Sequence, residues 1–262
     1  MDYIKVLIIS LVALATLDAD AQRVVSLLPS ATYTAAQIGA DANIIGRTSY
    51  CPQPADGTKS KVVGDAMTVN VEAIMSLSPD VVIVSPFTAA NVVTRLKSLK
   101  INVVSLPTPK DFDEICNQAI TIGELTGHKT QAEALVAKEH ANVAAIVASV
   151  KNTNNAGVYF QIGTKPIWGA TPDYFINDIA AHLGAKNVLK VGEGACSRES
   201  VLSRKPDLIV ISTLGGLGDG EAALWKKLTK AKIVLVDENI LCCPTPVFFR
   251  TALSAIVDAI NK

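Results

Sequence analysis

The sequence predicts an α/β protein with two Rossmann-like lobes, mainly parallel sheets and one long helix that joins the lobes. Three observations lead to this fold class. Short apolar runs rich in β-branched residues alternate with stretches of helical pattern. The middle of the chain, from 111 to about 151, has no strand pattern. Two segments on either side of it, 70–85 and 197–212, are similar in sequence.

The N-terminal segment predicts export. Lys5 precedes an apolar run over 6–17, which Ala19-Asp20-Ala21 follows. A positive start, a short apolar run and an A-x-A site are typical of a cleavable signal peptide. The alternative is a membrane anchor, but the run is too short to cross roughly 30 Å of hydrocarbon as a helix. We therefore expect residues 1–21 to be removed, Gln22 to begin the mature protein, and the protein to be exported.

The strands and helices follow from patterns of apolar residues. Six runs are apolar except at Ser26, Ser105 and Gln161, as expected of strands that helices cover on both faces: 24–27, 81–84, 103–106, 158–162, 208–211 and 233–236. The middle of the chain predicts one helix over 111–126 and a longer, alanine-rich helix over 130–151. We expect an N-terminal lobe over 22–126, a connecting helix over 127–151 and a C-terminal lobe over 152–262.

The similar segments suggest that the lobes are related by pseudo-symmetry. They align without gaps at an offset of 127 positions. Each opens with a helix N-cap candidate, Asn70 or Ser197, and each has a glutamate two residues later, Glu72 or Glu199. In each, Pro-Asp precedes an apolar strand. A common helix–strand connection would explain the Pro-Asp, but it would not explain the paired glutamates.

Composition and missing motifs favour binding over catalysis. The formal net charge is zero, with 24 basic and 24 acidic residues and no basic run, which argues against nucleic-acid binding. The three histidines are far apart, and the chain has neither a G-x-S-x-G elbow nor a Walker loop. We expect no catalytic residues, no catalytic cofactor and no resident metal.

The chain has five cysteines: Cys51, Cys116, Cys196, Cys242 and Cys243. Cys116 is expected in a helix core, and the other four in loops. Because export permits disulfides, we expect a bond between Cys196 and either Cys242 or Cys243. The alternative is that a loop cysteine is a thiolate ligand for a bound metal centre.

Several motifs together resemble a known family. They lie at 23–30 (RVVSLLPS), 48–52 (TSYCP), 63–64, 70–85, 161–163 with Pro166 and Trp168, 197–212, and 244–246 (PTP). The chain resembles the class III periplasmic substrate-binding proteins of ABC importers, in particular the group that binds vitamin B12 (cobalamin). Related groups carry haem or ferric siderophores. The resemblance implies a monomer that binds a metal chelate between its lobes and delivers it to a permease dimer in the inner membrane.

The resemblance also implies the ligand-binding residues. They are Pro29, Ser30, Tyr50, Phe87, Trp168 and Asn239. Aromatic faces suit a flat macrocycle such as a corrinoid, although these aromatics could instead fill the lobe cores. The B12-binding pattern has tryptophans where this chain has Ala66 and Glu193, and a Trp and an Arg near Ile240 and Cys243.

These departures leave haem or a ferric siderophore as alternatives to cobalamin. An anionic siderophore would favour an arginine-lined cleft, for which Arg47, Arg198 and Arg250 are candidates. A metal-cluster oxidoreductase on a related two-lobed fold is a further alternative, and it would need several Cys or His side chains at one site.

The resemblance assigns Glu72 and Glu199 to docking on the permease, where each would meet arginines of one subunit. One exposed carboxylate on each lobe would give a two-point electrostatic register. The alternative is that each glutamate only stabilises its helix through the helix dipole.

Overall fold

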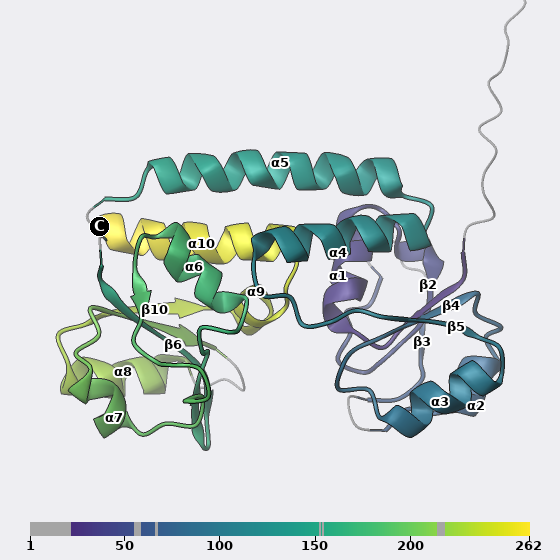
Figure 1. The fold of residues 1–262 in the computed structure, drawn as a ribbon, viewed down its shortest axis with the longest axis horizontal. Helices are drawn as coiled ribbons and strands as arrows, with labels where there is room; N and C mark the ends of the chain where they lie inside the picture. Colours follow the sequence, from purple (N-terminus) through teal and green to yellow (C-terminus); the bar gives the residue numbers. More distant parts are fainter. Residues whose placement is uncertain (1–21, 55–58, 66–67, 152, 154, 214–217) are drawn as a thin grey trace, which may run out of the picture.

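A computed structural model describes residues 22–54, 59–65, 68–151, 153, 155–213 and 218–262. The expected signal peptide, residues 1–21, lies outside these ranges. Two α/β lobes lie side by side beneath a layer of long helices (Figure 1). Within the described ranges, no helix has the length and apolar character needed to cross a membrane.

The N-terminal lobe is built on a parallel sheet of five strands in the order β3-β2-β1-β4-β5. The strands are β1 (Val24–Ser26), β2 (Ile44–Arg47), β3 (Lys61–Val62), β4 (Val81–Val84) and β5 (Asn102–Ser105). Helices α1 (Pro29–Gln37), α2 (Val71–Met75) and α3 (Ala90–Ser98) and the short 3-10 helix η1 (Asp41–Asn43) connect them. Side chains of β4 alternate between two apolar clusters, one shared with α1 and the other with α2 and α3. This explains why the strand is a continuous apolar run.

The C-terminal lobe has a second sheet, in the order β10-β9-β6-β7, with β8 paired to β6. Its strands are β6 (Gly157–Thr164), β7 (Ile167–Gly169), β8 (Lys186–Asn187), β9 (Leu208–Ser212) and β10 (Lys232–Val236). Only β7 is antiparallel to its neighbour. The helices are α6 (Ile176–His182), α7 (Arg198–Ser203), α8 (Gly218–Leu228), α9 (Glu238–Cys242) and α10 (Pro246–Asn261). The predicted fold class is confirmed.

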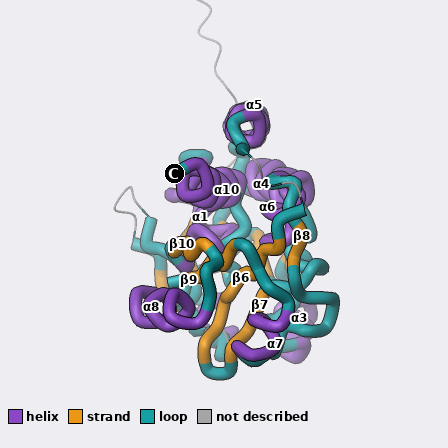
Figure 2. Tube along the Cα trace, turned by 90° about the vertical axis from the view of Figure 1, so that its left-hand side faces the viewer, coloured by secondary structure: helices purple, strands orange, loops and turns teal. Residues whose placement is uncertain are grey.

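The connecting region contains α4 (Phe112–Leu125) and α5 (Lys129–Ala148). Asp111 caps α4 by accepting a hydrogen bond from the backbone N–H of Glu114 at 2.8 Å. Gly127 has a φ of +73°, in the left-handed region, which allows the turn into α5. Helix α5 packs against α4 and α10 and forms the outermost layer (Figures 1 and 2).

Direct contacts also join the two lobes beneath α5. Gln37 of α1 donates from Nε2 to Oγ1 of Thr245, the N-cap of α10, at 3.0 Å. The rings of Tyr33 and Phe248 meet edge to face, with their centroids 4.9 Å apart. The lobes are therefore connected by side-chain contacts as well as by the chain.

The segments that are similar in sequence are also similar in structure. Each forms a short capped helix, a turn and a buried strand. Ser78 has a φ of +45°, and Lys205, 127 positions later, has a φ of +51°. In the same way, Asp80 accepts a hydrogen bond from the N–H of Arg23 at 2.7 Å, and Asp207 accepts one from the N–H of Gly157 at 2.8 Å. Matching strained residues and matching carboxylates support the pseudo-symmetry of the lobes.

Candidate functional site

A cleft lies between the lobes and contains about 580 Å³ of space free of protein atoms, part of it open to solvent. The N-terminal lobe contributes segments at the carboxyl ends of β1, β4 and β5. From β1 the chain adds β2 and β3 on one side of the sheet and then β4 and β5 on the other, so the sheet has a topological switch point between β1 and β4. The crevice at such a point is the usual ligand site of open α/β sheets. The cleft is therefore the candidate ligand site.

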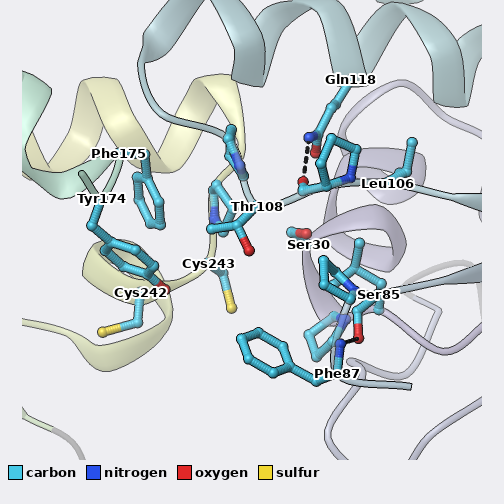
Figure 3. A pocket seen from close by; sticks show the side chains of 16 residues that line it. Ser30, Ser85, Phe87, Leu106, Thr108, Gln118, Tyr174, Phe175, Cys242 and Cys243 are labelled. Atoms are coloured by element: carbon cyan, nitrogen blue, oxygen red, sulfur yellow. Dashed lines mark hydrogen bonds between the residues drawn. The ribbon is translucent and has the colours of Figure 1, made fainter. Parts of the chain in front are cut away.

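The N-terminal wall of the cleft consists mainly of prolines and small polar side chains. It includes two of the residues expected from the sequence, Pro29 and Ser30, at the start of α1. Phe87 follows β4, is 81% exposed, and extends its ring into the space between the lobes (Figure 3). Its N–H donates to Oγ of Ser85 at 3.2 Å, which fixes the turn that presents the ring. The sequence had not indicated the prolines at 86, 107 and 109.

The C-terminal wall comes from two places that the sequence did not indicate as neighbours. Tyr174 and Phe175 lie just before α6, and Cys242, Cys243 and Pro244 lie between α9 and α10. Burial, and then the nearby Cys242 and Cys243, raise the pKa of Tyr174 to about 12, so its hydroxyl keeps its proton at neutral pH. This wall offers an aromatic ring, a hydroxyl and a thiol.

The described residues that line the cleft include no charged side chain. The three arginines considered for an anionic ligand are engaged elsewhere. Arg47 is buried and donates to Gln53 and to the backbone carbonyls of Thr48 and Cys51. Arg198 pairs with Glu221 at 2.6 Å, and Arg250 pairs with Glu139 at 2.9 Å.

Three other expected ligand residues lie outside the set that lines this cleft. Tyr50 is exposed in the turn after β2. Trp168, on β7, is half-exposed and packs its ring over Gly194, where an added Cβ would come within 2.7 Å of the indole. Asn239 is the second residue of α9 and is partly buried. Of the residues linked to the resembled B12 pattern, Ala66 lies outside the described residues, and Glu193 pairs with Arg204 at 2.5 Å.

The expected disulfide between Cys196 and Cys242 or Cys243 is wrong, because all five cysteines are free. Cys196 packs with the apolar cluster on one face of the second sheet and contacts the Tyr159 hydroxyl at 3.3 Å. Cys242 packs with the cluster on the other face. The sheet therefore separates the two thiols. Cys116 is buried in α4, as expected, whereas Cys242 ends a helix rather than lying in a loop.

Glu72 and Glu199 are both exposed and occupy equivalent places in α2 and α7. The N-cap side chains accept hydrogen bonds from the third residue beyond them, at 2.8 Å for Asn70 and 3.2 Å for Ser197. Hydrogen bonds from its own backbone amide and from Ser197 lower the pKa of Glu199. The two helices lie at the ends of the molecule away from α5 (Figure 1).

Among the described residues, no group of three or more His, Cys, Asp or Glu side chains is arranged to hold a metal ion.

Comparisons with known proteins agree with this geometry. The model of the periplasmic binding protein family matches residues 24–233. A cobalamin-binding protein of Halobacterium salinarum is 32% identical over 205 residues, which cover 74% of this chain and 55% of the relative. The chain thus spans about half the length of that relative. A vitamin B12-binding protein of Yersinia pseudotuberculosis is 24% identical over 88% of this chain and 84% of its own.

The fold is also that of solved periplasmic proteins. A periplasmic haem-binding protein of Vibrio cholerae superposes with a TM-score of 0.79 at 19% identity, over 92% of this chain and 99% of its own. At this identity the likeness concerns the fold alone. The family model covers most of the chain and includes both sheets apart from the last strand's end, so this chain belongs to the periplasmic binding protein family.

Proposed function

We propose that this protein binds a corrinoid, cobalamin in the first place, in the cleft between its lobes and delivers it to the permease of an ABC importer. The observation that carries the proposal is the uncharged cleft, with Phe87 on one wall and Tyr174 and Phe175 on the other. Aromatic and proline surfaces suit the apolar faces of a macrocycle. Ser30, Thr108 and Gln118 add neutral polar groups that suit the amide side chains of a corrinoid.

The same observation weighs against the alternative ligands. Haem carries two propionates and many ferric siderophores are anionic, and such ligands gain most from arginine or lysine partners. The lining residues include neither, and Arg47, Arg198 and Arg250 are occupied. The two relatives by sequence are named for cobalamin and vitamin B12. The role is binding and transfer, without a catalytic step.

A titration of the mature protein with cyanocobalamin, haem and a ferric tris-catecholate tests the ligand. Calorimetry and absorbance should both show saturable binding of cyanocobalamin, with one site per protein. Tight binding of haem or of the ferric chelate, without binding of cyanocobalamin, would transfer the function to that alternative.

Two aromatic variants locate the ligand. Phe87→Ala should lower the affinity for cyanocobalamin about fivefold to tenfold, because an aromatic contact contributes about 1 kcal/mol beyond its area. The melting temperature of this variant should not change, since the Phe87 ring is exposed. Trp168→Ala is the matched comparison, with an aromatic side chain outside the lining set. A loss in Trp168→Ala alone would place the ligand at the β6–β7 hairpin instead.

We further propose that Glu72 and Glu199 are the docking points for the permease. Their equivalent positions, exposure and placement on the two lobes support this role. The helix-dipole explanation accounts for either residue alone, but it does not require both to occur at equivalent positions.

The double variant Glu72→Arg with Glu199→Arg should lose permease binding and uptake, while cyanocobalamin affinity and melting temperature stay close to those of the parent. Glu133→Arg with Asp258→Arg is a matched control, because it changes the charge equally at exposed positions of the helix layer, on α5 and α10. Normal uptake by the folded Glu72/Glu199 variant would contradict the docking role.

A further inference from the structure

The cysteines around the cleft differ in what their sulfur atoms contact. The buried Cys51 Sγ lies 3.2 Å from Oγ1 of Thr48 and 3.7 Å from the carbonyl oxygen of Ser26. Cys242 Sγ lies 3.7 Å from Oγ of Ser212 and points away from the cleft (Figure 3). Cys243 Sγ points into the space between the lobes and, within the described part of the chain, has no hydrogen-bond partner. Cys243 is therefore the thiol that the cleft presents to a ligand.

The backbone holds this thiol in place from both sides. The N–H of Cys243 donates to the carbonyl of Asn239 at 2.9 Å, which closes the last turn of α9. Two residues later, Thr245 caps α10 by accepting a hydrogen bond from the N–H of Phe248 at 3.1 Å. A residue fixed between two capped helices can hold a ligand atom in a defined position.

The placement suits an axial ligand of a flat metal chelate. A macrocycle that lies between the lobes turns one face to each wall, so that its two axial positions point at the walls. The wall opposite Ser30 and Phe87 carries Cys243. Among the side chains that line the cleft, a thiolate is a stronger ligand for a first-row transition metal than a hydroxyl or an amide.

We propose that Cys243 is an axial ligand of the bound corrinoid and that the protein selects cobalt(III) corrinoids with an exchangeable axial water. This inference rests on the proposed function. The Cys243 thiol loses its proton, its sulfur forms a bond to cobalt, and the axial cobalt–water bond breaks. Water leaves with its electron pair, the proton passes to solvent, and cobalt stays in the +3 state. Corrinoids whose axial position is held by cyanide or by an alkyl group would bind through the ring alone.

In the empty cleft the Cys243 thiol holds its proton. Burial, and then the neighbouring Cys242 and Cys51, raise the pKa of Cys243 to about 12. The thiol therefore stays protonated and weakly reactive in the empty cleft. Coordination to a metal removes its proton.

The experiment compares aquocobalamin with cyanocobalamin on the reduced, full-length mature protein. With aquocobalamin, the parent should give the changed visible spectrum of a cobalt–thiolate bond and an affinity at least tenfold above that for cyanocobalamin. Cys243→Ser and Cys243→Ala should lose the spectral change and bind both forms about equally. Cys196→Ser is the matched control, because its thiol lies on the other side of the second sheet, and it should keep the spectral change.

The outcomes separate the two proposals. Equal binding of both cobalamins by the parent, without a spectral change, would overturn axial ligation and leave corrinoid binding intact. A spectral change that persists in Cys243→Ser would also overturn it. Absence of any cobalamin binding by the folded parent would overturn both the ligand and its axial residue.

Discussion

The hydrogen-bonded network around Glu221 provides a quantitative test of how the C-terminal lobe holds α7. The Glu221 carboxylate accepts two hydrogen bonds from Arg198, at 2.6 and 2.7 Å, and one from Gln161 at 3.0 Å. Gln161 in turn accepts one from the indole N–H of Trp225 at 2.7 Å. Gln161 and Trp225 are fully buried, and Glu221 is nearly so. Because Arg198 directly precedes Glu199, this network anchors the helix that carries a proposed docking residue.

Glu221→Ala removes the anion and leaves the Arg198 guanidinium without its partner. Breaking a buried ion pair costs about 3–5 kcal/mol. The Arg198 side chain is 27% exposed and can be partly rehydrated, so we expect a loss of about 2–3 kcal/mol in the free energy of unfolding. Glu221→Gln keeps the size and some of the hydrogen bonds, and it should cost about 1–2 kcal/mol.

Urea denaturation, monitored by circular dichroism, measures these differences. An unchanged slope of the free energy of unfolding against urea concentration would show that the variant changes only stability. Glu193→Ala is the comparison, because it breaks the more exposed Glu193–Arg204 pair and should change stability little. If Glu221→Ala were as mild as Glu193→Ala, the network would not anchor the lobe, and the reasoning from burial would be refuted.

Four further predictions concern single residues. Hydrogen bonds from Arg204 and from the Lys190 amide lower the pKa of Glu193 to about 2. The small stabilising effect of this carboxylate should be present above pH 4.5 and disappear as pH falls through 2. In Arg204→Gln the Lys190 hydrogen bond remains, so NMR titration should show a Glu193 pKa raised only part of the way to its ordinary value. Phe112→Ala, at a site 3% exposed, should cost about 3–5 kcal/mol by chemical denaturation. With a pKa of about 12, Cys243 of the empty protein should be alkylated slowly at pH 8 and faster up to pH 11, and a rate already constant at pH 9 would contradict this. Mass spectrometry of the exported protein should find Gln22 at its N-terminus, and retention of Met1 would contradict cleavage.

The sequence predicted the strands that helices cover on both faces. Strands β1, β4 and β9 are buried at every position, and they read as apolar runs apart from the serine that ends β1 and the serine that ends β9. It did not indicate β2, β3, β7 and β8. Strand β2 contains Gly46 and the buried Arg47, and β3 and β8 have two residues each. Such short pairings form because neighbouring strands offer hydrogen bonds, and local sequence does not encode them.

The sequence likewise predicted some residues of the candidate site and not others. Pro29, Ser30 and Phe87 directly follow strands of a parallel sheet, and sequence position alone indicates which edge they occupy. Tyr174 and Cys243 reach the cleft from a turn and from the end of a short helix. The distance of these two residues from the other wall depends on the relative placement of the lobes, and local sequence patterns do not predict that placement. Two signals in the sequence pointed to Cys243, namely the last loop of the resembled family and the presence of a loop cysteine that could bind a metal centre.

The contacts beneath α5 explain how two separate lobes can form one defined cleft. The Gln37–Thr245 hydrogen bond and the Tyr33–Phe248 pair join α1 to α10. These helices begin next to the two walls, since Pro29 starts α1 and Pro246 starts α10. Separating the lobes at this point would expose both rings and break the hydrogen bond, so the contacts oppose a change in the distance between Ser30 and Cys243. An axial bond to cobalt tolerates only a small error in length. Contact between α1 and α10 is therefore the feature of the fold on which selection by Cys243 depends.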